Sequence, residues 1–315
     1  MLDFIFQLKK RIFKMIKRLF LGTTEVNFIN VGKTFYKFFI VEVILFVSVI
    51  TLSLFGLLNV NLSVDFTGGT TYQLDAEYTD TDIEEVMSSN LLDVSRYQTF
   101  DNSNSIIFRA TENTQEKETE FLFYLSNKFQ VPDEEIDFQR VGPTFGEEIT
   151  EKGLQALIIF LSLVVLLISY RYEFKYSLIA LVALTHDLLL VFCIYVLLGL
   201  EITPSTVIAL LTILGYSLYD TVILFDKLKD SIKTSKFSYL SVESLNKTFN
   251  EVLMRSLNTS ITSAIPIASI LFLGNYLGLS GTLTDFALPL FIGILSGTYS
   301  SIFVTVPFLS KIINN

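Results

Sequence analysis

The run from Ile213 to Phe225 is almost wholly apolar, yet it contains the carboxylate of Asp220. On insertion scales, a charged side chain at the centre of a bilayer costs about 2.5–3.5 kcal/mol. A buried carboxyl group beside a cation can change its protonation state, because burial favours the neutral form and the cation favours the charged form. Asp220 is therefore a candidate for reversible proton binding, with Arg255 of the next apolar segment as its candidate partner.

Helical spacing predicts further polar residues beside these two. One stripe has a spacing of four, with a serine one turn before the acid, and consists of Thr212, Tyr216, Ser217 and Asp220. A second stripe lies in the next segment and consists of Arg255, Thr259, Thr262 and Ser263. We expect the stripes to face each other as a polar seam, in which Arg255 pairs with ionised Asp220 and separates from it on protonation. A static salt bridge that fixes helix register is the alternative.

Two more ionisable residues, His186 and Asp187, lie near the middle of a third apolar segment. Histidine titrates near neutral pH, so both residues are candidates for proton coupling; a hydrogen-bonded core histidine is the alternative. Successive residues of a helix point about 100° apart, so we expect the two side chains to contact different partners. Glu42, toward the cytoplasmic end of the first apolar segment, is interpreted as an interfacial or interhelical contact, with a proton relay as the alternative.

These residues belong to a chain of 315 residues that is 51% hydrophobic and 17% charged, with a mean hydropathy of +0.53. A hydrocarbon core of ~30 Å requires about 20 apolar residues per spanning helix. Six segments meet this requirement: residues 36–60, 154–169, 177–199, 202–225, 257–278 and 284–309. The second is short unless its helix extends back toward Ile149. A soluble helical protein would need an improbably large apolar core to bury six such runs.

Basic residues predict the orientation of these segments. Residues 1–35 form a basic amphipathic N-terminus without the apolar core and cleavage site of a signal peptide, as expected for a helix on the anionic cytoplasmic leaflet. Six Lys and Arg residues fall in the loop 226–256, whereas the short loops near 199–204 and 274–284 have none. The positive-inside rule then places both termini, including the tail 311–315, in the cytoplasm.

The polar region of residues 61–150 lies between the first span and the other five, which occupy residues 151–310, and is predicted to be extracytoplasmic. Its pattern is an alternating strand at 64–78, a capped helix after Thr79, a hairpin, a second helix at 114–130 and a last strand. This β-α-β-β-α-β order is that of a ferredoxin-like fold. The predicted fold class is an α-helical membrane protein with six transmembrane helices and one extracytoplasmic ferredoxin-like α+β domain between helices 1 and 2.

Charge is unevenly distributed along the chain. The net charge is −9, but residues 61–153 alone hold twenty Asp and Glu against six Lys and Arg. Such an acidic domain argues against nucleic-acid binding. It has no His and no Cys, so we interpret it as a binding or moving part, with an inert spacer as the alternative. A single His, the lone Cys193 and the lack of a phosphate-binding loop argue against an enzyme and against a metal site.

Glycine motifs follow the first span and recur in later ones. Residues with candidate hinge or structural roles are Asp65, Gly68, Gly69, Gly142, Pro143 and Gly215. Two adjacent glycines permit positive φ and close backbone approach, so the first pair is either a hinge or a tight turn into a strand. In the last span Gly293 and Gly297 form a G-x-x-x-G pattern, with Ser300 and Ser301 beside it. This pattern predicts close packing against another span or a partner.

Several sequence blocks occur in an order that resembles the SecD/SecF family of protein-export membrane subunits. They are Val64-Asp-Phe-Thr-Gly-Gly69, Val141-Gly-Pro-Thr-Phe-Gly146, Ala183-Leu-Thr-His-Asp187, Gly215-Tyr-Ser-Leu-Tyr-Asp-Thr-Val222, Arg255-Ser-Leu-Asn-Thr259 and Gly297-Thr-Tyr-Ser-Ser-Ile302. The block that contains Asp220 is the most specific. One departure is Lys227 after Asp226, where the family usually has Arg; lysine lacks the planar fork that binds two oxygens at once.

The resemblance implies a SecF-type subunit that forms a heterodimer with SecD. It further implies contact with the SecYEG translocon, a translocating polypeptide and membrane lipid. Such a subunit uses the proton-motive force to promote protein translocation across, and release from, the cytoplasmic membrane. Matching aspartate and arginine positions are implicated in proton coupling in the family, which points to Asp220 and Arg255. Protons would be the coupling ion, without a cofactor.

Two other functions stay open. One is half of a proton-driven small-molecule exporter of the related resistance-nodulation-division superfamily, for which residues 61–153 are a small porter domain. The other is a translocon scaffold without proton coupling.

Overall fold

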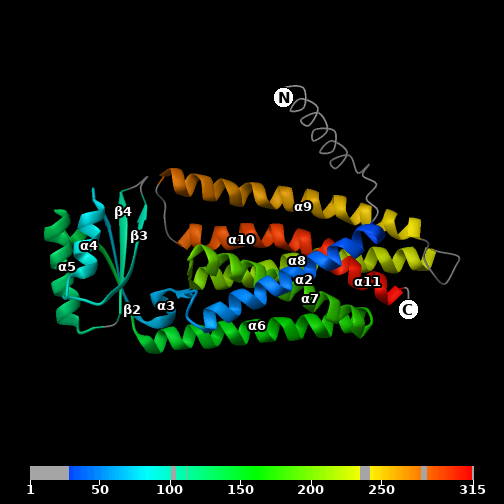
Figure 1. Cartoon of the computed structure of the whole chain (residues 1–315), viewed down its shortest axis with the longest axis horizontal. Coiled ribbons are helices and arrows are strands. Elements are labelled where there is room, and N and C mark those ends of the chain that lie inside the picture. Colours follow the sequence, from blue (N-terminus) through cyan, green and yellow to red (C-terminus); the bar gives the residue numbers. More distant parts are fainter. Residues whose placement is uncertain (1–27, 101–103, 112, 235–241, 278–281, 314–315) are drawn as a thin grey trace, which may run out of the picture.

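A computed structural model describes residues 28–100, 104–111, 113–234, 242–277 and 282–313. The described part is mostly helical and has two regions, a bundle of long helices and a sheet domain at one end of it (Figure 1). Most of the predicted basic segment 1–35 lies outside the described residues, so its amphipathic helix stays a prediction.

Six helical segments among the described residues are long and apolar enough to cross a membrane. They are α2 (Phe28–Leu54), α6 (Pro143–Arg171), α7 (Phe174–Leu198), α8 (Pro204–Thr234), α9 (Val242–Leu277) and a last segment that joins α10 (Thr282–Tyr299), the π-helical turn η2 (Ser300–Val304) and α11 (Thr305–Ile313). Each coincides with one predicted span, so the prediction of six apolar helices is confirmed.

Three predicted boundaries differ from the structure. The first helix ends at Leu54 and not at residue 60, and at two other places helices continue past the apolar runs. The predicted second span, 154–169, is only the apolar centre of α6, which begins with Pro143 in its first turn. The predicted loop 226–256 is helical at both ends, since α8 and α9 extend into it from either side. These extensions bury apolar side chains such as Leu228 and Phe249 in the bundle core, which stabilises them as helices.

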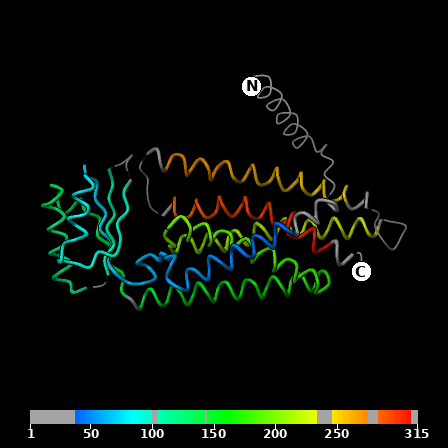
Figure 2. The backbone as a smooth tube through the Cα atoms, in the orientation of Figure 1, coloured from blue at the N-terminus to red at the C-terminus, as the bar shows by residue number. Residues whose placement is uncertain are grey.

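The bundle has an inner and an outer set of helices. Between 39 and 61% of the residues are buried in the spans of α7, α8 and α10–α11, against 11% in those of α2, α6 and α9. Helices α8 and α9 both pack on α10, and α2 crosses the bundle obliquely beside α7 and α11 (Figure 2). Asp187 and Asp220 lie on inner helices and are 0% and 2% exposed, so both carboxylates are in the interior of the bundle.

The sheet domain consists of β2 (Gly69–Asp75), α4 (Asp80–Ser88), β3 (Val94–Phe100), β4 (Ser105–Ala110), α5 (Gln115–Phe129), the 3₁₀ turn η1 (Asp133–Glu135) and β5 (Asp137–Val141). The strands lie in the order β3-β4-β2-β5, and every neighbouring pair is antiparallel. Both helices cover the same face of the sheet (Figure 1). Tyr72, Phe108, Phe121 and Leu125 fill the space between helices and sheet and are fully buried.

Local sequence signals in this domain agree with the structure at three places. Thr79 caps α4 in a reciprocal capping box with Asp82. The predicted hairpin is β3–β4, and the predicted second helix is α5. The alternation over residues 64–78 is wrong at its start, because Val64–Thr67 form the helical turn α3 and the strand begins only at Gly69. This turn packs against α6, where the peptide of Phe66 lies against Gly146.

The buried carboxylate of Glu118, on α5, ties the helix to the sheet. It accepts a hydrogen bond from Thr70 Oγ1 at 2.9 Å and lies 3.4 Å from Arg140 Nε. The hydroxyl of Tyr72 donates to the Glu118 carbonyl at 3.1 Å, and burial, with a smaller contribution from Glu118, raises the pKa of this phenol. Because the charge is paired inside a closed core, we interpret it as structural.

Three contacts fasten the sheet domain to the bundle. Strand β1 (Asn61–Leu62) pairs in parallel with β6 (Glu201–Ile202), which lies between α7 and α8. Arg109 of β4 forms an ion pair with Glu201 at 2.5 Å, and both side chains are largely buried. Burial raises the pKa of the Glu201 carboxyl, although Arg109 and Arg96 oppose the shift. The third contact is the packing of α3 on α6. The domain therefore meets the bundle through backbone, charge and packing together.

Candidate functional site

The interior of the bundle is organised around the carboxylate of Asp187, on α7. Its Oδ2 accepts hydrogen bonds from Ser217 Oγ at 2.5 Å and from Ser300 Oγ at 2.8 Å, and its Oδ1 accepts one from Ser296 Oγ at 2.6 Å. These hydroxyls come from α8, η2 and α10, so one side chain joins α7 to three other elements. Three donated hydrogen bonds satisfy most of the acceptor capacity of a carboxylate.

Small residues let the serines converge on Asp187. A β-carbon at Gly293 would overlap the side chain of Ile213, and one at Gly297 would lie 3.1 Å from Ser217 Cβ. The G-x-x-x-G pattern therefore brings α10 close to α8, another span of the same chain. Of the two serines predicted to assist packing, Ser300 donates to Asp187, and the buried Ser301 donates to the Thr298 carbonyl at 3.2 Å.

His186 lies beside Asp187 and extends the polar network toward α2. Its Nε2 is 3.2 Å from Glu42 Oε2, and its Nδ1 is 3.4 Å from Asp187 Oδ1. The ring packs against the aromatic side chains of Phe39, Phe46 and Tyr299. As expected, His186 and Asp187 have different principal partners, and Glu42 makes an interhelical contact.

Asp220, on α8, belongs to a second network on the side of α9. It accepts a short hydrogen bond from Ser256 Oγ. One turn away, Tyr216 Oη donates to Ser260 Oγ at 3.2 Å, and Ser260 is hydrogen-bonded to Thr298 of α10. A polar seam between α8 and α9 is therefore present, with Asp220 at one end.

Arg255 does not form the predicted ion pair with Asp220. Its side chain is exposed, its Nη2 donates to Tyr219 Oη at 2.8 Å, and its guanidinium lies over the Tyr219 ring at 5.8 Å. The ion pairs found among the described residues do not include Arg255 with Asp220. The reason is helical phase: Ser256, the next residue, points to Asp220, so Arg255 points about 100° away.

Other residues predicted for the seam likewise make their hydrogen bonds elsewhere. Thr212, Thr259 and Thr262 donate hydrogen bonds to carbonyls of their own helices, and Ser263 is half-buried on α9. Ser217, expected beside Asp220, donates to Asp187 instead. The seam residues of α9 are Ser256 and Ser260, which also have a spacing of four. The sequence does contain this repeat of Ser256 and Ser260, but the larger polar residues Arg255 and Thr259 directly precede them and have the same spacing.

Comparison with known proteins identifies the fold and this arrangement of helices. A family model described as protein export membrane protein SecD/SecF, C-terminal, matches residues 124–315, and one described as the SecD/SecF GG motif matches residues 60–77. The chain belongs to the SecD/SecF family. With six apolar helices, this member of the family is a multi-pass membrane protein.

Relatives in the SecD/SecF family carry names of protein translocase subunits. Subunit SecF of Streptomyces coelicolor is 43% identical over 190 residues, which are 60% of this chain and 51% of that protein. Subunit SecF of Desulfurispirillum indicum is 32% identical over 79% of this chain and 81% of its own length. Subunit SecDF of Thermus thermophilus is 33% identical over 78% of this chain, but the match covers only 33% of that protein.

A solved structure of a SecDF protein has the same fold over most of this chain. The crystal structure of SecDF from Thermus thermophilus superposes with a TM-score of 0.79 at 28% identity, over 94% of this chain and 40% of that one. The chain spans about half the length, or less, of the first curated relatives that it matches. It therefore corresponds to one part of the longer SecDF protein.

The glycine pair of the SecD/SecF family motif forms a tight turn between α3 and β2. Gly68 and Gly69 have φ of +74° and +136°, and a β-carbon at Gly69 would overlap the carbonyl oxygen of Ala110. Both positions therefore require glycine. Asp65, in α3, accepts a hydrogen bond from Ser63 Oγ at 3.1 Å. The geometry is that of a turn into a strand; whether the chain also bends here stays a prediction.

The other predicted structural positions are less constrained. Gly142 is the N-cap of α6 with φ of −72°, and Pro143 follows in the first helical turn. Gly215 lies on the outer face of α8, where a β-carbon would meet no other atom of the chain within 4 Å among the described residues.

Asp226, at the end of α8 away from the sheet domain, binds a guanidinium from another helix. Arg171 Nη2 lies 3.0 and 2.8 Å from its two carboxylate oxygens, and Tyr172 Oη donates to it at 2.6 Å. Burial, assisted by Asp226, raises the pKa of Tyr172 to about 12. Lys227 lies 3.6 Å from Glu251 of α9. Asp226 thus joins the end of α8 to the end of α6, while Lys227 faces α9.

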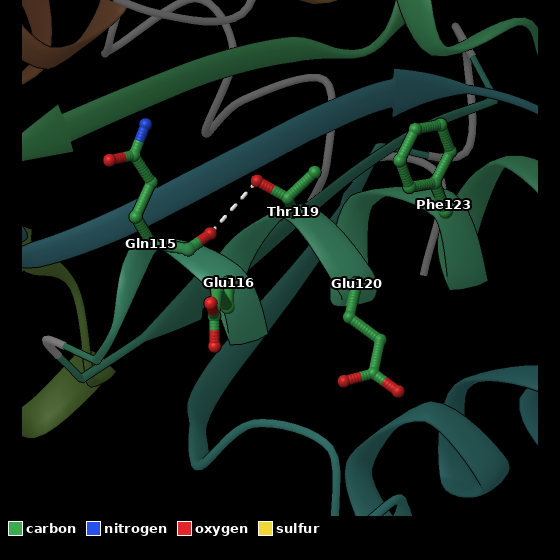
Figure 3. Close-up of a pocket in the computed structure, with 5 residues that line it drawn as sticks. All are labelled: Gln115, Glu116, Thr119, Glu120 and Phe123. Atoms are coloured by element: carbon green, nitrogen blue, oxygen red, sulfur yellow. Dashed lines mark hydrogen bonds between the residues drawn. The ribbon is translucent and has the colours of Figure 1, made fainter.

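A surface hollow of about 530 Å³ follows the outer face of α5 (Figure 3). All of its lining residues come from that helix: Gln115, Glu116, Thr119, Glu120 and Phe123. The hydroxyl of Thr119 donates to the Gln115 carbonyl at 2.8 Å, so it is already satisfied. This acidic hollow with one exposed aromatic ring lacks the buried, convergent polar groups of the bundle interior, and the bundle remains the candidate site.

Proposed function

We propose that this chain is a SecF-type subunit of the Sec translocase that, together with a SecD-type half, uses the proton-motive force to promote protein translocation across, and release from, the cytoplasmic membrane. The observation that carries the proposal is the pair of carboxylates, Asp187 and Asp220, buried among serine hydroxyls inside a six-helix membrane bundle. Protons are the proposed coupling ion, and no cofactor is required.

Proton coupling needs an acid that can exchange both its proton and its partner. Asp220 accepts a hydrogen bond from Ser256, and the guanidinium of Arg255 lies on the adjacent helical position. Protonation of Asp220 would remove its attraction to Arg255, and loss of the proton would restore it. Because the side chain is 2% exposed, a change of charge there alters the packing of α8 on α9 rather than being screened by water.

A partner half is supported by polar groups on the outer faces of α8 and α9. Thr212, Tyr219, Arg255 and Thr262 are exposed within these two spans. An arginine in contact with lipid tails is costly unless water or protein covers it. The small surface at Gly215 lies on the same face of α8 and permits close approach of a partner helix. The SecDF relative combines the two names in one protein, which supports SecD as that partner.

The sheet domain fits a mobile or binding part outside the cytoplasm. Its element order and antiparallel strand order β3-β4-β2-β5 support assignment as a ferredoxin-like domain. The distribution of basic residues supports an extracytoplasmic domain with both termini cytoplasmic. On this proposal the domain contacts the translocating polypeptide, and the bundle contacts lipid, SecD and the SecYEG translocon.

The deciding experiment is Asp220→Asn, which preserves side-chain shape and removes the titration. We expect normal co-purification with SecD but loss of the part of export that a protonophore abolishes in membrane vesicles. The matched control is Asp230→Asn, an exposed carboxylate on the same helix, which should retain full stimulation. Full proton-dependent export by Asp220→Asn would favour the scaffold function, and failure of SecD to co-purify with the unaltered chain would favour a separate exporter.

A further inference from the structure

A cavity of about 390 Å³, open at the surface of the bundle, lies between α2, α7 and α10, next to the Asp187 network. Most of its wall is apolar, and its polar lining residues are Glu42, Ser296 and Tyr299. Ser296 donates to Asp187 at 2.6 Å, and Glu42 lies 3.2 Å from His186. The network thus reaches this cavity at two points.

Exposure falls along the network from the cavity to the interior. The side chain of Glu42 is 28% exposed, that of His186 is 1% exposed and that of Asp187 is 0% exposed. Glu42 lies in the first third of the apolar span Lys37–Leu54 of α2, where a carboxylate in contact with hydrocarbon would be costly. The cavity is large enough for several waters, and its polar groups supply the partners that ordered water needs.

We propose that Glu42 is a port through which protons pass between water in this cavity and Asp187, with His186 as the relay. In the inward step the Glu42 O–H bond breaks as an Nε2–H bond forms on His186. The Nδ1–H bond of the ring then breaks as an O–H bond forms on Asp187 Oδ1. One proton enters and one leaves the ring, so no other reactant is needed, and the ring returns to its first tautomer before the next transfer.

The groups that face these acids fit a relay. Glu42 faces His186 of α7 and the hydroxyl of Tyr299 of α10. Asp187 faces His186 and three serine hydroxyls of α8, α10 and η2. On the remaining sides of the imidazole, Phe39 and Phe46 exclude water. The path leaves the bundle on the side of α2, whereas Asp220 lies on the side of α9, so the two acids reach different surfaces.

The first experiment tests whether water reaches Glu42 and does not depend on the proposed function. Cys193, the only cysteine of the chain, is replaced by alanine, and Glu42→Cys or Ile44→Cys is then introduced. Ile44 is 60% exposed on the same helix and serves as the lipid-facing control. A positively charged methanethiosulfonate should modify Glu42→Cys at least about tenfold faster, because a thiol in hydrocarbon does not ionise. Equal rates at the two positions would refute the port.

The second experiment rests on the proposed function and compares Glu42→Gln with Glu42→Asp. Glutamine keeps the contact with His186 but cannot carry a proton, so we expect loss of proton-driven export; aspartate should restore part of it with a shifted pH profile. If Asp220→Asn abolishes export while Glu42→Gln does not, the relay is wrong and the proposed function stands. If Asp220→Asn has no effect, the proposed function fails. Equal losses in the Gln and Asp variants, with no shift in pH profile, would show a packing role and overturn the relay.

Discussion

Asp187 and Asp220 are both buried acids on inner helices, but their surroundings differ. Asp187 accepts hydrogen bonds from three serines on three elements and also contacts His186. Asp220 accepts one from Ser256 and has an exposed guanidinium on the adjacent position of α9. A carboxylate with many partners resists rearrangement, whereas one with few can exchange them. The comparison teaches that a change of charge at Asp187 disturbs contacts with three other elements, whereas a change at Asp220 disturbs one contact with α9.

The largest predicted difference concerns stability. Asp187→Asn replaces an acceptor oxygen with an NH₂ group, which faces serine hydroxyls as a second donor. Each buried donor left without an acceptor costs about 1–3 kcal/mol, so we expect a loss of roughly 3 kcal/mol. Asp220→Asn loses less, about 1 kcal/mol, because one bond is affected. The chain has no tryptophan, so thermal unfolding in detergent is best followed by circular dichroism. Equal losses would remove the distinction between the acids.

A smaller effect is expected from the glycine that supports the Asp187 network. In Gly297→Ala the new methyl group lies 3.1 Å from Ser217 Cβ, so α10 must move from α8 and the serine from Asp187. Overpacking of this kind typically costs about 1–3 kcal/mol. Gly215→Ala, on the open outer face of α8, is the matched control and should not destabilise the isolated chain. Because Gly215 faces the proposed partner, this control should instead weaken co-purification with SecD.

The smallest effect concerns the largely buried carboxylate of Glu201, at the junction with the sheet domain. Burial raises its pKa in the folded state, so the unfolded chain ionises first as the pH increases. Stability should therefore fall as the pH rises from the ordinary carboxyl range to the raised pKa, and stay lower above it. Glu201→Gln should remove this part of the pH dependence in unfolding measurements from pH 4 to 7. A stronger pH dependence in the variant would mean that Arg109 outweighs burial.

The sequence predicts the helices and strands well, but it does not predict how each helix is rotated about its own axis. Six apolar runs, the Thr79 cap and the β3–β4 hairpin depend on local patterns, and the structure agrees with each. Whether the stripe of Arg255 or that of Ser256 faces α8 depends on the rotation of α9. Both stripes are polar, so the sequence does not distinguish them. The contact of Glu42 with His186 joins residues 144 positions apart. Contacts between residues so far apart are determined by helix packing, so neither the periodicity of a segment nor a short motif predicts them.

The peptide hydrogen bonds between β1 and β6 have a mechanical consequence. They join the end of α2 to the connection between α7 and α8, the helices that carry Asp187 and Asp220. A change in the tilt of α7 relative to α8 would displace this connection, and with it the sheet domain, which follows β1 in the chain and is ion-paired to Glu201 through Arg109. Since the sheet extends beyond the ends of the helices (Figure 1), a small angular change at its base becomes a larger displacement at its outer edge.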